Sequence, residues 1–282
     1  MIILILILVL LLIPSAPAAP EPLQLSWTNN MLTIAAPWIP GEKIEVWHME
    51  AFCRAGSTKR DWKETTIPHR TTLVSASKKG DQIKLSTVVE PFASCEHEIQ
   101  STADEVTITY KLKNPGLSEA EIEWFQPACI RLAKFTGLDQ ANYIQRSFIF
   151  ARVDDKGEVY RDGQPRLVYL DKLPRSEDAV YKGGQVYVPE GINLDDVNPR
   201  PISTIKPANG LIGCVSADDK YLLATASSQT HELFQGVIVC LHSDPRVGGL
   251  KRGETKTIRQ KIYIIKNDPN ELLRRYGRDF SR

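Results

Sequence analysis

The chain has almost no net charge, and that absence excludes one class of partner. Its 282 residues include 35 Lys and Arg against 34 Asp and Glu, without a basic cluster. Nucleic-acid binding needs concentrated positive charge opposite the phosphates, so we expect no nucleic-acid partner. The motifs GxSxG, GxGxxG and GxxxxGK followed by Ser or Thr are also absent. A nucleophile elbow and a phosphate-binding loop therefore lack support.

Cysteine is scarce and has no metal-binding spacing. The five cysteines are widely separated and no CxxC pair occurs, so a zinc ribbon is not supported. Cys214 and Cys240 lie in apolar runs, where buried and inert thiols are typical. Cys53, Cys95 and Cys129 lie near polar segments, where one disulfide is permitted in an exported chain. The sequence does not select a pairing.

Charged side chains are absent from the first eighteen residues, which predict an export signal. Ile2 to Ile13 form an apolar run, Pro14 ends it, and Ala16-Pro17-Ala18 is a small-x-small cleavage site. No Lys or Arg precedes the run. About twelve residues at ~1.5 Å each are too short for a bilayer core of ~30 Å. We expect a signal peptide over 1–18, no stable membrane insertion after its cleavage, and a secreted or periplasmic mature chain.

The remaining chain is rich in strands. Apolar residues alternate with polar ones over 105–114, which predicts a strand with one face on a core. Turn residues separate similar segments, and strands are predicted over 23–27, 31–35, 43–52, 71–77, 82–89, 95–102, 105–114, 119–126, 209–217, 220–228, 234–242 and 255–265. Asp268 and Pro269 begin a C-terminal helix. The prediction is an all-β fold, a large two-sheet antiparallel sandwich with that helix.

Residues 151–208 differ from the rest because they are rich in Gly, Pro and charge. Apolar anchors at 168–170 and 186–188 predict that this stretch is an ordered loop region lying on the domain. We therefore predict a single β-sandwich domain over 19–282.

Polar residues first gather over 48–62. His48 and Glu50 are two apart on a predicted strand, so we expect them on one face as an acid–base pair, or as a surface ion pair. Trp62 lies in a polar loop and is the best of the five tryptophans for stacking on a sugar ring. Arg54 and Asp61 are predicted to contact the substrate beside it.

A second candidate segment runs from Gln126 to Arg131, at the end of a predicted strand. Arg131 is suited to a bidentate contact with a carboxylate such as that of a uronic acid, and Gln126 to binding substrate. His231 and Glu232 form a third candidate, in a gap between strands. Their motif is not HExxH, because Gln235 stands where the second His belongs, so zinc protease chemistry is not supported.

His242 ends the strand predicted over 234–242 and leads to Asp244. It is either a satisfied core histidine or one tuned toward neutral pH. At ~3.3 Å per residue, His231 and His242 would lie roughly 30 Å apart at opposite ends of that strand. We expect no cofactor and no metal, although loop carboxylates such as those of residues 195 and 196 are of the type that binds Ca²⁺.

Two runs carry a family resemblance: CEHEIQSTADEVTITYKLKNPGLSEAEIEWFQP over 95–127 and GGLKRGETKTIRQKIYII over 248–265. They resemble the strand-and-turn pattern of galactose mutarotase-like supersandwich domains, and with NGLIGCVSADDKYLLATASS the chain is similar to exported proteins of planctomycete-type bacteria. Aldose epimerases, polysaccharide lyases and accessory domains of glycoside hydrolases share that fold, so the resemblance implies a carbohydrate partner. The His–Glu pair of the epimerases has no match here, because His97 lies too early.

The resulting functional expectation is a carbohydrate-binding or carbohydrate-processing protein. Epimerase, lyase or hydrolase chemistry would draw on His48, Glu50, Arg131, His231 or Glu232. The alternative is a non-catalytic glycan-binding or structural envelope module. The two classes differ in geometry, because an enzyme needs a His and a carboxylate, or two carboxylates, converging in one concave site.

The export signal is directly testable. We expect the mature chain to begin at Ala19, because cleavage follows Ala18. N-terminal sequencing of the protein recovered outside the cytoplasm would show this start. A protein that keeps Met1, or that remains in the cytoplasm, would contradict the prediction.

Overall fold

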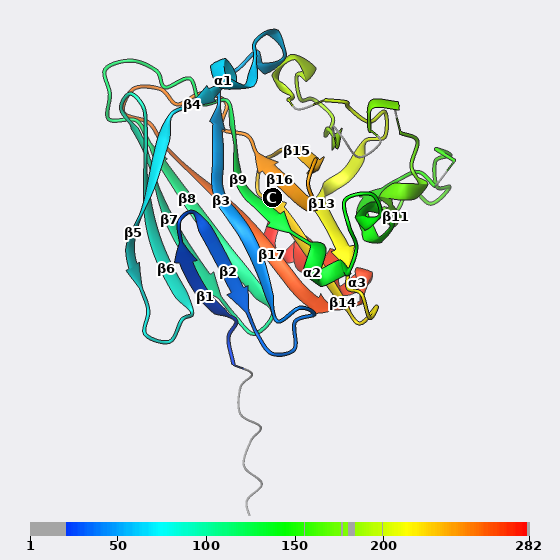
Figure 1. The fold of residues 1–282 in the computed structure, drawn as a ribbon. Helices are drawn as coiled ribbons and strands as arrows, with labels where there is room; N and C mark the ends of the chain where they lie inside the picture. Colours follow the sequence, from blue (N-terminus) through cyan, green and yellow to red (C-terminus); the bar gives the residue numbers. More distant parts are fainter. Residues whose placement is uncertain (1–20, 155, 176, 180–183, 199, 281–282) are drawn as a thin grey trace, which may run out of the picture.

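A computed structural model describes residues 21–280 except 155, 176, 180–183 and 199 (Figure 1). The predicted signal peptide lies outside the described residues. Within this part of the chain, strands form two stacked sheets, called here sheet A and sheet B. None of the helices described is both long and apolar enough to span a membrane.

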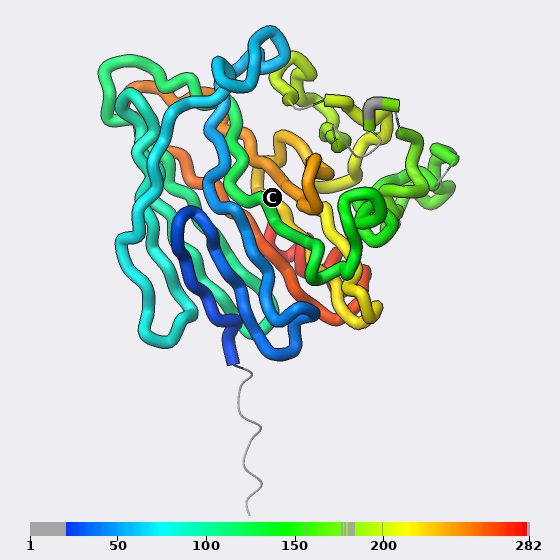
Figure 2. The backbone as a smooth tube through the Cα atoms, in the orientation of Figure 1, coloured from blue at the N-terminus to red at the C-terminus, as the bar shows by residue number. Residues whose placement is uncertain are grey.

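Sheet A has eight strands. Its order is β1 (Gln24–Thr28), β2 (Met31–Ala35), β3 (Lys43–Cys53), β9 (Trp124–Arg131), β16 (Cys240–Pro245), β15 (Thr230–Gln235) and β12 (Gln185–Tyr187), and β4 (Thr66–Ile67) pairs with β3. The tube in Figure 2 shows that the first strands of the chain lie beside strands from its middle.

Sheet B has nine strands and packs behind sheet A. Its order is β11 (Arg166–Tyr169), β10 (Ser147–Ala151), β13 (Pro207–Val215), β14 (Tyr221–Ser227), β17 (Thr255–Lys266), β8 (Glu105–Lys113), β7 (Ala93–Ser101), β6 (Gln82–Val89) and β5 (His69–Ala76). The paired strands of both sheets run antiparallel. Apolar side chains from both sheets fill the space between them, as the alternating pattern of β6, β7 and β8 predicts.

Helix is confined to short segments and to one C-terminal helix. The short ones are α1 (Trp62–Thr65), α2 (Ala133–Thr136) and 3₁₀ turns η1 to η5 at 57–59, 143–146, 170–172, 177–179 and 194–196. The C-terminal helix α3 (Pro269–Phe280) begins with Asp268, whose Oδ1 accepts hydrogen bonds from the backbone N–H groups of residues 270 and 271. Leu272 is buried against the outer face of sheet B.

The predicted fold class is confirmed: an antiparallel two-sheet sandwich with a C-terminal helix. Two strand boundaries were wrong. The strand predicted over 119–126 begins only at Trp124, and the one predicted over 234–242 is a hairpin. The Gly236 N–H donates to the Cys240 carbonyl at 3.0 Å and closes that hairpin. Its turn contains the apolar residues Val237 and Ile238, so the amino-acid composition of this segment does not indicate a turn.

Met49 and Glu50 form a bulge in β3. Both stand opposite the single residue Pro127 of β9. Met49 has a φ of 61°, and its carbonyl accepts a hydrogen bond from His69 Nε2 at 3.0 Å. An extra residue breaks the alternation of a strand. The prediction that His48 and Glu50 share a face is therefore wrong: His48 is fully buried, whereas the Glu50 side chain is 37% exposed.

His48 instead joins the two sheets through their shared core. Its Nε2 lies 3.0 Å from His97 Nδ1, and His97 Nε2 lies 2.8 Å from the Thr87 hydroxyl, which bonds Thr71. Burial lowers the pKa of His48 to about 3 and that of His97 well below its usual value. Both rings are therefore neutral at pH 7 and act as part of the core.

The buried His48 predicts a loss of stability in acid. The unfolded chain takes up a proton below a pKa of 6.5 while the folded ring does not, so stability is complete above pH 6.5 and falls as the pH drops toward 3. At pH 5 the cost is about 2 kcal/mol. Urea unfolding at pH 7 and 5 should show His48→Gln losing less free energy across this interval than the wild type. Equal losses would contradict the assignment.

Candidate functional site

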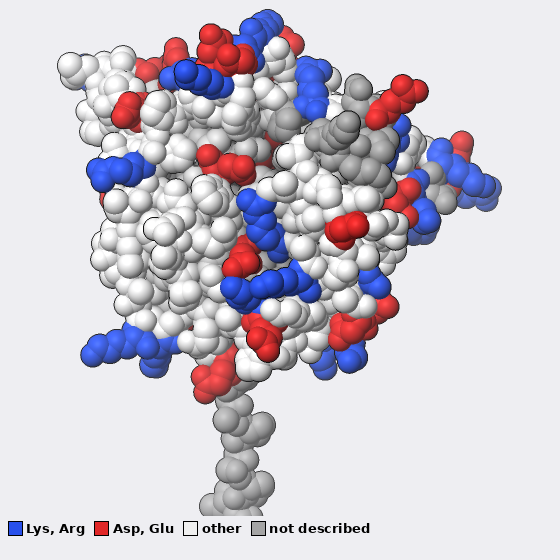
Figure 3. Space-filling model, in the orientation of Figure 1, with Lys and Arg blue, Asp and Glu red and all other residues white. Residues whose placement is uncertain are grey.

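An open groove lies where β3, β4 and α1 meet on the outer side of sheet A. Its volume is about 780 Å³, and its lining includes Glu50, Arg54 and Trp62. The sequence analysis grouped these three residues in one candidate segment, and the structure places them in one groove. Figure 3 shows that acidic and basic side chains are interspersed over this side of the molecule, without a patch of one sign.

Short-range structure holds each of these three side chains in place. The bulge turns Glu50 outward. Arg54 donates to the carbonyls of residues 64 and 66, at 3.1 and 2.8 Å. Asp61 caps α1, since its Oδ1 accepts from the Glu64 N–H at 2.8 Å. The structure therefore shows Asp61, a predicted substrate ligand, supporting the helix turn that carries Trp62.

Trp62 is the outer member of a stack of rings that leads into the protein. Its indole is 42% exposed and lies 6.3 Å from that of Trp124, centroid to centroid. Trp124 is fully buried and stacks on His231 at 5.1 Å with an interplanar angle of 11°. Burial lowers the pKa of His231 to about 4. His231 is thus a neutral ring beneath the groove rather than an exposed acid or base.

Glu50 also joins the groove to a buried polar cluster on the same face. Its Oε2 lies 3.8 Å from His242 Nε2, and His242 Nδ1 lies 3.6 Å from Asp244 Oδ1. Asp244 Oδ2 accepts a hydrogen bond from Gln126 Nε2 at 3.0 Å. Glu232 pairs with Asp244 across the β15–β16 hairpin. His231 and His242 lie on the two adjacent strands of this hairpin, so the expected separation of roughly 30 Å along one strand was wrong.

The carboxyl group of Glu232 is fully buried. Among the described residues, neither of its oxygens has a hydrogen-bond partner. Burial raises its pKa well above the usual value, the Asp244 carboxylate raises it further, and His242 opposes both effects. The surroundings of Glu232 therefore favour its protonated, neutral form.

Burial also raises the pKa of Asp244, although its bonds to His242 and Gln126 oppose this. Burial by itself lowers the pKa of His242. The neighbouring Cys129 and Asp244 side chains act in the opposite direction, and the net effect raises the pKa of His242 above its usual value. The cluster therefore concentrates acidic and basic groups away from water, behind Glu50.

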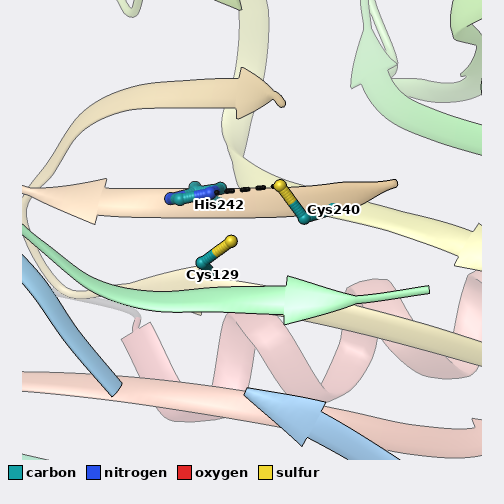
Figure 4. A group of neighbouring side chains, drawn as sticks. All are labelled: Cys129, Cys240 and His242. Carbon is teal, nitrogen blue, oxygen red and sulfur yellow. Dashed lines mark hydrogen bonds between the residues drawn. The ribbon is translucent and has the colours of Figure 1, made fainter. Parts of the chain in front are cut away.

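Cys129 and Cys240 lie beside His242. Cys129 comes from β9, and the other two come from the adjacent β16, as Figure 4 shows. The Cys240 Sγ lies 3.5 Å from His242 Nε2. All five cysteines are buried and free. Cys53, Cys95 and Cys129, expected near polar loops, lie instead within strands β3, β7 and β9.

Two predicted site residues lie apart from this arrangement. His48 is in the core between the sheets. Arg131 ends β9 opposite Glu45 of β3, half-buried and outside the lining of the groove. Sequence reasoning weighed His242 together with Asp244 without choosing either. It interpreted Cys240 as an inert buried thiol and gave Cys129 no role beyond a permitted disulfide. The only available signal was their position on strands whose pairing the sequence did not reveal.

Comparison with known proteins finds similarity in the path of the backbone. No family model and no curated protein matches it. The Slr1438 protein of Synechocystis aligns with a TM-score of 0.48 and 9% identity over 90% of this chain and 98% of its own. A putative aldose 1-epimerase of Escherichia coli K12 aligns at 0.44 and 11%, over 86% and 99%. Galactose 1-epimerase of Lactobacillus acidophilus aligns at 0.40 and 7%, over 88% and 98%. Likeness of this degree does not extend to a reaction.

Glu232→Gln tests the neutral buried acid. Because the folded pKa is raised, the stability contributed by Glu232 is complete below pH 4.5 and is lost as the pH rises. The amide does not ionise, so we expect the variant to lose less free energy of unfolding than the wild type between pH 5 and pH 8. Urea unfolding at both pH values measures this. Glu121→Gln, at a side chain that is 77% exposed, is the control and should lose as much as the wild type. A parallel pH dependence in Glu232→Gln and wild type would show that Glu232 is charged.

Proposed function

We propose that this chain is an exported carbohydrate-binding protein and that the groove at Trp62 is its sugar site. The observation that carries the proposal is an exposed indole in an open groove that also contains a carboxylate and a guanidinium. The apolar face of a sugar ring packs on an indole, while its hydroxyls need hydrogen-bonding groups at the ring edge. Glu50 accepts and Arg54 donates such bonds.

The stack beneath Trp62 supports this role because it fixes the indole before a ligand arrives. Asp61 caps the turn that carries Trp62, and Trp124 lies against the indole from inside. A pre-positioned ring loses little conformational entropy on binding. The apolar leader over residues 1–18 supports export, where extracellular or periplasmic glycans would be met.

Carbohydrate processing is a second candidate, and Glu50 favours it. Glu50 is the carboxylate shared by the groove and the buried cluster, and it faces His242 at 3.8 Å. A half-exposed carboxylate beside a histidine provides a proton acceptor and a donor, which epimerase, lyase and hydrolase reactions all require. In this case Glu50→Gln would retain sugar binding and lose turnover, as followed by the anomeric proton signals of the bound sugar.

Trp62→Ala tests the binding site. Titration calorimetry and thermal shift against mono- and oligosaccharides, including uronic acids, would first identify a ligand for the mature chain. We expect Trp62→Ala to weaken its binding at least about tenfold, equivalent to ~1.4 kcal/mol. Trp47→Ala is the matched control, since Trp47 is 37% exposed on β3 but lies outside the groove lining. If no saccharide binds, or if both variants weaken binding equally, the proposal fails.

A further inference from the structure

Three soft metal ligands converge on the outer face of sheet A. One ligand atom each from Cys129, Cys240 and His242 lies within 4.8 Å of the others, and all three residues are buried. The Cys240 Sγ to His242 Nε2 distance is 3.5 Å. A tetrahedral Zn²⁺ with Zn–S of ~2.3 Å and Zn–N of ~2.0 Å places its sulfur and nitrogen ligands about 3.6 Å apart. The ligand pair therefore already has the spacing of a zinc site.

The architecture around the cluster suits an ion. Cys129 lies on β9 while Cys240 and His242 alternate on β16, so two neighbouring strands present all three toward one side (Figure 4). Gly236 makes room for the Cys240 thiol, because a Cβ at residue 236 would collide with its Sγ. Rigid strands hold metal ligands more closely than loops do.

Polar side chains also support His242 from behind. The nitrogen of His242 that faces away from Cys240 lies 3.6 Å from Asp244 Oδ1, and Gln126 binds the other oxygen of Asp244. A carboxylate behind the imidazole is the usual partner of a zinc-bound histidine, because it fixes the tautomer and the ring orientation. In the part of the chain that the structure describes, His242 Nδ1 and Asp244 Oδ1 have no other hydrogen-bond partner, so they are available to each other.

We propose that Cys129, Cys240 and His242 bind a thiophilic transition-metal ion, Zn²⁺ in the first instance. Thiolate and imidazole ligands select such ions over Mg²⁺ or Ca²⁺. Glu50 Oε2 lies 3.8 Å from His242 Nε2, and Glu50 also lines the groove, so the cluster and the groove share this residue as a neighbour. This metal site is distinct from the proposed sugar site, and the proposal of a metal ion does not depend on sugar binding. With the ion bound, His242 no longer exchanges a proton, and the acid–base candidate would rest on Glu50.

The test uses the full mature chain, purified with a reductant and freed of metal by dialysis. We expect it to bind one equivalent of Zn²⁺, measured by elemental analysis and competition with a chromophoric chelator. Co²⁺ in its place should give a thiolate-to-cobalt charge-transfer band. Loss of a ligand should weaken Zn²⁺ binding by more than about 100-fold in each of the variants Cys129→Ser, Cys240→Ser and His242→Asn. Asp244→Asn removes only the carboxylate behind the His242 imidazole, so we expect it to weaken binding by about 10- to 100-fold. Cys214→Ser, at a buried thiol of sheet B, is the matched control and should bind normally.

Three results would overturn the proposal. One is the absence of stoichiometric binding, and another is equal binding by the ligand variants and Cys214→Ser. The third is a Cys129–Cys240 disulfide in protein purified without reductant, shown by three titratable thiols in place of five. If a ligand variant does not fold, the charge-transfer band of the unaltered chain decides the matter. Sugar titrations with and without Zn²⁺ separate failure of this site from failure of the groove.

Discussion

A prolyl residue cannot donate a hydrogen bond to a neighbouring strand, and Pro127 stands in β9, in the interior of sheet A. The neighbouring strand β3 has a bulge at this point, in which Met49 and Glu50 both stand opposite Pro127. That bulge sends His48 into the core, where it bridges the sheets, and turns Glu50 out toward the groove. A regular ladder would place both side chains on one face. The core contact and the groove would then not coexist in this form.

The buried cluster is costly to the fold. Protein interiors rarely hold a carboxyl group without a hydrogen-bond partner, and here Glu232 lies beside a second buried carboxyl group and a histidine. Such groups oppose folding, and the apolar packing between the sheets must offset them. Costs of this kind concentrate where a protein holds reactive groups in place for a ligand. The position of the cluster directly behind Glu50 is consistent with that pattern.

The fold class could be predicted because strand alternation and turn residues are local signals. The hairpins at 23–35, 71–89 and 209–228 follow from such signals, and so does the helix begun by Asp268. The 234–242 segment could not be divided correctly, because its turn is made of Gly236 and three valine or isoleucine residues. That one error separated His231 from His242 and concealed the pairing of Glu232 with Asp244.

The groove and the buried cluster depend on how distant strands pair. For this reason some of their residues could be predicted from the sequence and others could not. Glu50, Arg54 and Trp62 lie close in sequence, so local reasoning grouped them. Cys129 and Cys240 come from strands more than a hundred residues apart in the chain, and no spacing motif marks them. His48 was misplaced because a bulge depends on the partner strand, here on the proline opposite it.

The strand order also determines when the molecule is able to fold. β17 lies in the middle of sheet B, between β14 and β8, yet it follows all the other strands of the described residues in chain order. Until residue 266 is made, β8 and β14 each lack a neighbour and expose an unpaired edge. Pairing between such distant segments is slow. The order of strands therefore delays completion of sheet B until β17 has been synthesised.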